Sequence, residues 1–117
     1  MTATERAVEL TRAAAAAAED KLAQDIVAFD VSELLAITDV FLLCSASTPR
    51  QARAVQDAIE ERMISLGAKA VRREGEREGR WILLDFADIV VHVQHQEERG
   101  FYALERLWSD CPTVALS

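Results

Sequence analysis

The side chains best suited to chemistry in this sequence are those of His92, His95 and Asp85. The two histidines are three residues apart on one predicted strand, so they point to opposite faces and cannot hold a metal ion together. Asp85 could form an acid–base pair with His92 across a hairpin, but no motif places a nucleophile beside them. A hydrogen-bonded structural histidine is therefore the better interpretation of His92.

A run of small residues from Ser45 to Thr48 joins a predicted strand to a predicted helix. Backbone N–H groups at such a helix start can bind phosphate. Nucleotidyltransferases carry a Gly-Ser pair at this turn and an Asp-x-Asp strand after it, whose carboxylates hold Mg²⁺. Here the glycine is missing, no Asp-x-Asp follows, and Asp85 and Asp88 have the wrong spacing to replace it. We therefore expect no catalysis, no metal and no cofactor, with residual nucleotide binding at this turn as the alternative.

Cysteine usage and charge limit the function classes further. Cys44 lies in an apolar run and Cys111 precedes Pro112, and neither has a metal ligand at suitable spacing, so both are expected to be free thiols. The 20 acidic and 13 basic residues give a net charge of −7, which disfavours direct nucleic-acid binding and favours a basic protein partner. No apolar run reaches the roughly 18 residues of a membrane span, and no signal peptide is recognisable, so a cytoplasmic location is expected.

Hydrophobic periodicity and turn signals predict the elements that position these residues. The 117 residues suit one domain over 1–117, with about 110–117 as a short C-terminal tail. The predicted order is α-β-β-α-β-β-β-α, an α/β fold with five strands and about three helices. The elements are a helix over 3–22, strands over 25–31 and 39–46, a helix from Thr48–Pro49 to Gly67, strands over 69–74, 80–86 and 89–95, and a helix over 97–108.

Three of these elements carry further expectations. The first helix has a narrow stripe of mostly alanine that ends at Leu22, so it should dock loosely or fray at its start. The strands over 25–31 and 39–46 are apolar on both faces, as is typical of central strands that are covered on both sides. The last helix should turn three large apolar side chains inward: Phe101, Leu104 and Trp108.

The predicted hairpin has one face of unusual composition. If Ala87 and Asp88 form the turn, Phe86 pairs with Ile89 and the register of the whole hairpin follows. One face is then wholly apolar and belongs to the core. The opposite face combines a large aromatic and aliphatic side chains with polar ones: Trp81, Leu83 and Asp85 beside Val90, His92 and Gln94.

This mixed face allows two interpretations. A helix could cover it, or it could be an ordinary half-solvated sheet surface. Alternatively it docks a protein, because an exposed Trp and Leu among polar groups are typical of interface anchors. A Trp81→Ala variant that stays folded and loses its partner would favour docking.

The run from Trp81 to His92, followed by Phe101-Tyr102-x-Leu104-Glu105 and Trp108, is highly specific. With Ile37–Phe41, Cys44-Ser45 and Gln51, these residues resemble the ribosomal silencing factor family (RsfS, also called Iojap) over roughly residues 5–110. Two departures are mild. Ala46 stands where many relatives have glycine, and Phe86-Ala87 stands where Tyr-Gly is common.

The resemblance implies a function without chemistry. Members of this family bind the large ribosomal subunit through a ribosomal protein on its intersubunit face. They sterically block joining of the small subunit, which represses translation when nutrients are limiting. Organellar relatives assist large-subunit assembly, and members are often homodimeric. The family fold is a mixed sheet with helices, distantly similar to nucleotidyltransferases but without their catalytic residues.

The resemblance also implies which side chains meet the ribosomal protein. Trp81 and Leu83 would be desolvated anchors, while Asp85 and Tyr102 would fix orientation through hydrogen bonds to basic or backbone groups. His92, next to them on the mixed face, completes the expected partner-binding set. The surface that forms any homodimer is left open.

Overall fold

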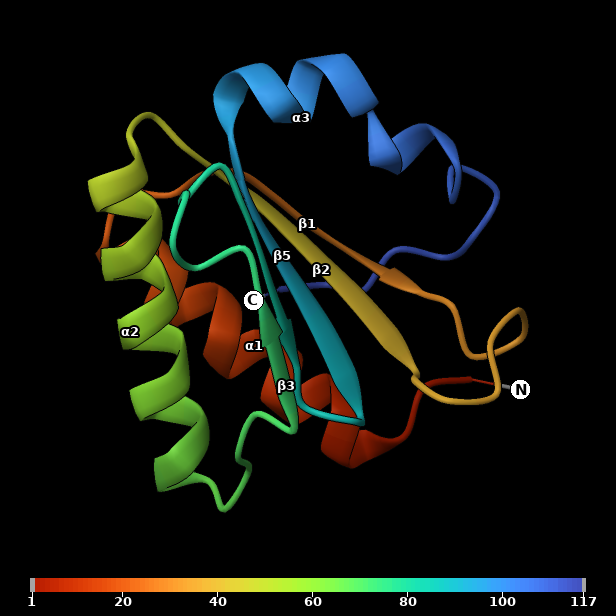
Figure 1. Cartoon of the computed structure of the whole chain (residues 1–117). Coiled ribbons are helices and arrows are strands. Elements are labelled where there is room, and N and C mark those ends of the chain that lie inside the picture. The colour runs from red at the N-terminus through yellow and green to blue at the C-terminus, as the bar shows by residue number, and fades with distance from the viewer. Residues whose placement is uncertain (1, 117) are drawn as a thin grey trace.

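In the computed structural model, two helices lie against one face of a five-stranded sheet and the C-terminal part of the chain crosses the other face (Figure 1). Residues 2–116 are described, without the side chains of Phe101 and Tyr102. The elements are α1 (Glu5–Asp20), β1 (Gln24–Asp30), β2 (Val40–Ala46), α2 (Pro49–Ser65), β3 (Arg72–Glu74), β4 (Trp81–Asp85), β5 (Ile89–His95), α3 (Gln96–Tyr102) and the 3₁₀ turn η1 (Leu104–Arg106).

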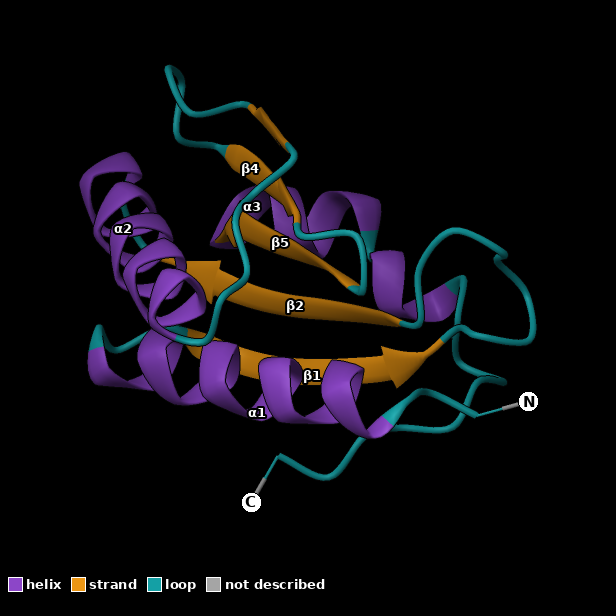
Figure 2. Ribbon diagram, turned by 90° about the horizontal axis from the view of Figure 1, so that it is seen from below, coloured by secondary structure: helices purple, strands orange, loops and turns teal. Residues whose placement is uncertain are grey.

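The sheet is mixed, as predicted. Its strand order is β1-β2-β5-β4-β3, with β2 and β5 parallel and the other pairs antiparallel. The larger core lies between this sheet and the helices α1 and α2 (Figure 2). A smaller apolar cluster lies on the opposite face, below α3 and η1. No helix within residues 2–116 has the length and apolar character needed to cross a membrane.

Helix α1 packs closely, and the expectation of loose docking was wrong. Ala7, Leu10 and Ala14 are fully buried against the sheet and α2. Their small side chains bury little area each but let the helix approach its neighbours closely, so the stripe is buried along the helix. Leu22 does not belong to this stripe, because the helix ends at Asp20 and a positive φ of 64° leaves Leu22 77% exposed.

The start of α1 is held by two hydrogen bonds, in contrast to the expectation that it frays. The side chain of Thr4 accepts a hydrogen bond from the N–H of Ala7 at 3.0 Å. The N–H of Thr4 donates to a carboxylate oxygen of Asp39 at 2.9 Å, which ties the helix start to the connection before β2. These two bonds satisfy backbone N–H groups that would otherwise depend on water for a partner at the helix end.

Helix α2 begins at Thr48–Pro49, as predicted. Its start resembles a capping box, except that the second bond goes to the residue before the cap and not to the cap itself. Thr48 accepts from the N–H of Gln51 at 3.0 Å and Pro49 takes the first helical position. The side-chain oxygen of Gln51 reaches back to the N–H of Ser47 at 2.7 Å, one residue before the cap. Its amide nitrogen donates to two carbonyl oxygens at the end of α1, both at 3.0 Å. Gln51 therefore joins the two helices that cover one face.

Strand β1 lies at the edge of the sheet, which corrects the expectation of a central strand. Its outer side is protected by the C-terminal tail. The N–H of Asp30 donates to the carbonyl of Pro112 at 2.8 Å, and the N–H of Val114 donates to that of Ala28 at 2.9 Å. The predicted central position of β2 is correct, since it lies between β1 and β5.

The hairpin of β4 and β5 has the predicted two-residue turn and register. The N–H of Phe86 donates to the carbonyl of Ile89 at 2.9 Å, and Ala87 takes a positive φ of 71°. Trp81 is paired with Gln94 and Leu83 with His92. The apolar face is buried in the larger core as expected, so the mixed face points to the opposite side.

The last predicted helix is interrupted. Helix α3 ends at Tyr102, and Ala103 adopts a left-handed conformation with φ 48° and ψ 51°. This turn redirects the chain, so that Leu104 is buried against the sheet and Trp108 packs on the same cluster. A continuous helix over 97–108 was therefore the wrong expectation, although two of its three inward residues do face the sheet. The third, Phe101, lies outside the described side chains.

Two glycines allow a matched test of this fold. Gly75 has φ +80°, and a Cβ there would lie 1.8 Å from the carbonyl oxygen of Trp81, whereas nothing lies within 4 Å of a Cβ at Gly100 in α3. We expect Gly75→Ala to lower the free energy of unfolding by about 2 kcal/mol or more. Gly100→Ala should raise it by up to about 1 kcal/mol through helix propensity. Chemical denaturation of both variants checks this, and two changes of the same sign would contradict the structure.

Candidate functional site

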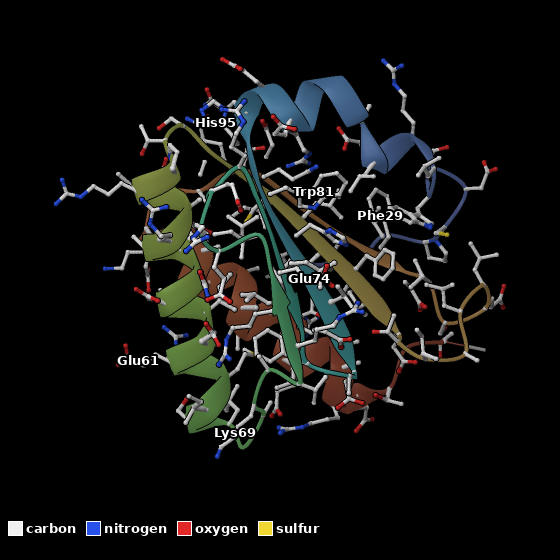
Figure 3. The ribbon with its side chains drawn as sticks, viewed as in Figure 1. Phe29, Glu61, Lys69, Glu74, Trp81 and His95 are labelled. Carbon is white, nitrogen blue, oxygen red and sulfur yellow. The ribbon has the colours of Figure 1, made fainter. Side chains whose placement is uncertain are left out.

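The mixed face of the hairpin is only half covered. We call it the Trp81 face: Trp81, Leu83 and Asp85 of β4 with Val90, His92 and Gln94 of β5. The three side chains from β5 are buried, because α3 lies over β5 and β2. The three from β4 are half-buried. Figure 3 shows Trp81 and Phe29 on the side of the sheet that faces the C-terminal segment. The C-terminal segment therefore covers this face over β5 but leaves β4 partly exposed.

Strand β3 extends this face to the edge of the sheet. Its register places Arg72 beside Asp85 and Glu74 beside Leu83. Arg72 and Glu74 form an exposed ion pair with N and O atoms 3.2 Å apart. A shallow hollow lies next to them, lined by Glu74, Gly75, Trp81 and Leu83. The uncovered part of the Trp81 face thus combines two apolar side chains with a rim of charged groups.

Trp81 is held by a hydrogen bond to the next strand. Its indole Nε1–H donates to Nδ1 of His92 at 3.1 Å. Because Nδ1 accepts this bond, the proton of the neutral imidazole is on Nε2. The ring of His92 also meets the ring of Phe41 edge-on, with centroids 5.4 Å apart. Burial lowers the pKa of His92 to about 4, so the ring stays neutral near pH 7.

The acid–base pair that the sequence allowed for His92 and Asp85 is not formed, and His92 is hydrogen-bonded to Trp81 instead, as the preferred structural interpretation predicted. Asp85 is paired with Val90 in the hairpin, and a carboxylate oxygen of Asp85 accepts from the N–H of Ala87 at 2.8 Å. Asp85 therefore stabilises the turn. His95 caps the start of α3, where its Nδ1 accepts from the N–H of Glu97 at 3.2 Å.

The turn proposed for nucleotide binding uses its polar groups internally. The hydroxyl of Ser45 accepts from Nη1 of Arg99 at 2.9 Å, and both residues are buried. The N–H and hydroxyl of Ser47 both donate to Gln51, at 2.7 and 2.8 Å. Within residues 2–116 no group of three or more His, Cys, Asp or Glu side chains could hold a metal ion. These contacts favour a structural turn.

Arg99 is a structural residue of this site that the sequence did not reveal. It is 8% exposed, and its Nε donates to a carboxylate oxygen of Glu105 at 3.1 Å. With its bond to Ser45, the guanidinium joins α3 and η1 to β2. An arginine within an amphipathic helix is usually solvated, so only the fold could identify this contact.

The structure brings together three of the five predicted site residues at the surface. Trp81, Leu83 and Asp85 follow one another on the same face of β4. His92 lies beside Trp81 on the neighbouring strand and is only 6% exposed, so it supports Trp81 and adds almost no exposed surface itself. Tyr102 lies outside the described side chains. Cys44 is a free thiol and fully buried, as its apolar run predicted, and that burial raises its pKa to about 12, which disfavours the thiolate.

The chain is similar to known proteins over nearly its whole length. A sequence model described as ribosomal silencing factor during starvation matches residues 4–117. The ribosomal silencing factor of Bacillus subtilis (strain 168) is 39% identical over 107 residues, which are 92% of this chain and 91% of that protein. The chloroplastic Iojap protein of Zea mays is 31% identical over 105 residues, 87% of this chain and 44% of that protein. A crystal structure of a protein from Chromobacterium violaceum has a TM-score of 0.83 at 31% identity, and the match covers 86% of this chain and 84% of that one.

The buried His92 predicts a loss of stability in mild acid. Its pKa is about 4 in the folded protein and 6.5 ordinarily, so the unfolded chain binds a proton first as the pH falls. Stability from His92 is complete above pH 6.5 and is lost between 6.5 and 4, by roughly 2–4 kcal/mol. His92→Asn keeps an acceptor near the position of Nδ1 but does not titrate. Urea denaturation from pH 7.5 to 4 should therefore give a steeper decline for the unmodified protein than for this variant, and equal declines would refute the assignment.

Proposed function

The chain belongs to the ribosomal silencing factor family, as its sequence pattern predicts, and from that premise we propose how it silences ribosomes. The Trp81 face docks on a basic protein at the intersubunit side of the large ribosomal subunit. The bound chain then blocks joining of the small subunit and represses translation under nutrient limitation. The action is regulatory, needs no cofactor and takes place in the cytoplasm, with residues 1–117 acting as one domain.

The observation that carries this proposal is the uncovered strip of β4. Trp81 and Leu83 are half-buried at the point where the cover over the second sheet face ends. A partner that packs on this strip would complete the burial of both side chains. Tryptophan is enriched among the residues that dominate binding energy, and a neighbouring aliphatic helps to exclude water from it.

Charge supports a basic partner. The net charge of −7 favours encounter with a positively charged protein and opposes approach to the phosphates of ribosomal RNA. Asp85 is half-buried on the Trp81 face, so its carboxylate can accept a charge-assisted hydrogen bond from a Lys or Arg of the partner. The prediction that Tyr102 adds a further orienting contact belongs to the same proposal.

The proposed inhibition is steric. The described chain measures about 37 × 32 × 25 Å, with a radius of gyration of 12.7 Å. A protein of these dimensions, bound on the intersubunit side of the large subunit, would hold the surfaces of the two subunits apart. The helices α1 and α2 lie on the sheet face away from the Trp81 face, so they would project toward the small subunit (Figure 1).

The family resemblance extends the proposal to a homodimer. If the dimer used the Trp81 face, only the monomer could bind the ribosome. If it used another surface, both protomers could bind. Sedimentation of the free chain with and without Trp81→Ala would separate these two arrangements.

Truncating the uncovered strip should weaken ribosome binding while the fold persists. We expect Leu83→Ala and Trp81→Ala each to weaken binding to isolated large subunits by about tenfold or more, because both remove an apolar anchor. Gradient co-sedimentation of labelled protein with isolated large subunits measures this loss.

The matched control is Ile64→Ala, which removes an aliphatic side chain that is 56% exposed on α2. It should bind large subunits like the unmodified protein, and thermal melting should show all three variants folded. Full binding by a folded Leu83→Ala variant would argue against the proposed face. Loss of binding in Ile64→Ala would place the contact on α2.

A further inference from the structure

Two side chains of β5 near the Trp81 indole can accept a hydrogen bond from it, those of Gln94 and His92. The indole donates to His92, although His92 is not its direct partner in the strand register. Gln94 lies directly opposite Trp81, whereas His92 lies opposite Leu83 and is therefore diagonal to it. The indole N–H nevertheless donates to His92 at 3.1 Å. Gln94 is fully buried, and neither its side-chain oxygen nor its nitrogen has a hydrogen-bond partner among the described residues. The bond to His92 thus determines which way the indole is turned.

His92 is itself fixed in place. It is 6% exposed and meets Phe41 edge-on at 5.4 Å. Phe41 in turn meets Trp108 edge-on, with ring centroids 4.7 Å apart and planes at 88°. A continuous row of rings therefore runs from the turn after η1 to the uncovered strip of β4. Such a row of packed rings leaves His92 little freedom to rotate.

We propose that His92 is a positioning residue, whose Nδ1 holds the Trp81 indole in its binding orientation before the ribosomal partner arrives. Phe41 packs edge-on against the imidazole, and Trp108 packs against Phe41 in turn. This inference rests on the proposed function and deepens it, because it gives His92 an action through Trp81 where the sequence predicted a direct contact with the partner.

Preorganisation explains how such a bond contributes to affinity. A tryptophan that rotates freely must be ordered when it binds, and that ordering opposes association. A tryptophan already held by a neighbour avoids this loss. The neutral ring is required for the bond, and the low pKa of the buried His92 keeps Nδ1 unprotonated over the physiological range.

The two amide substitutions of His92 test the inference at the level of single atoms. His92→Asn places an oxygen acceptor near the position of Nδ1, while His92→Gln places its amide near the position of Nε2. Nε2 has no partner among the described residues, so an amide there gives the indole no replacement. In the His92→Gln variant we expect the indole N–H to turn to Gln94, the acceptor directly opposite.

The experiment measures affinity for isolated large subunits. We expect His92→Asn to bind within about threefold of the unmodified protein and His92→Gln to bind about tenfold more weakly. Trp81→Phe keeps an aromatic ring without the N–H donor. In that background, His92→Gln should cause no further loss, because the bond between the two residues is already absent.

A measurement on the free protein completes the test. The indole N–H resonance of Trp81 is identified by its disappearance in Trp81→Phe. It should move less in His92→Asn, which keeps an acceptor near the position of Nδ1, than in His92→Gln. Equal affinities of the Asn and Gln variants, or full additivity with Trp81→Phe, would overturn the inference. If the unmodified protein fails to bind large subunits, the proposed function falls and this inference falls with it. If it binds and the two amide variants behave alike, only the inference falls.

Discussion

The structure depends on one constraint: a five-stranded sheet with apolar side chains on both faces must be covered on both sides, and residues 2–116 form only two long helices. Both pack on the same face, α1 through an alanine-rich stripe and α2 through larger side chains such as Ile59 and Met63. The opposite face is left to a helix of seven residues, a 3₁₀ turn and the stretch from Trp108 to Cys111, while the end of the tail lies along the β1 edge and packs on the larger core. This short segment covers β1, β2 and β5, and it leaves β4 half open. The strip of β4 is thus uncovered because both long helices lie on one face of the sheet and the segment on the other face is short.

Polar contacts hold the short cover in place and order the strip beside it. Arg99, buried against Ser45 and Glu105, joins α3 and η1 to the sheet. Arg80 donates to Glu97 and Glu98 at the start of α3, although these exposed ion pairs add little to stability. Together with the bond between Trp81 and His92, these contacts hold the cover and the indole in place while the apolar side chains of β4 stay half-exposed. A half-exposed tryptophan held in this way is typical of protein-recognition surfaces.

Local signals in the sequence were sufficient where a few neighbouring residues decide the structure. The Thr48–Pro49 helix start and the Ala87–Asp88 turn were predicted correctly, and the turn alone fixed the pairing of β4 with β5. The errors concern contacts between distant segments. Nothing near β1 indicated that residues 112–114 would pair with its edge. The left-handed Ala103 had no glycine to mark it, and the acceptor chosen by Trp81 depends on packing by Phe41 and Trp108.

The central claim is that the Trp81 face meets a basic protein of the large subunit, and photocrosslinking tests it most directly. A photoreactive amino acid with an aliphatic side chain of similar size, which preserves the apolar anchor, would replace Leu83 in one variant and Ile64 in another, and each would be irradiated with isolated large subunits. The account predicts that position 83 crosslinks to one basic ribosomal protein of the intersubunit side and that position 64 gives no crosslink to it. Crosslinking of position 83 to ribosomal RNA alone, or of position 64 to that same protein, would contradict it.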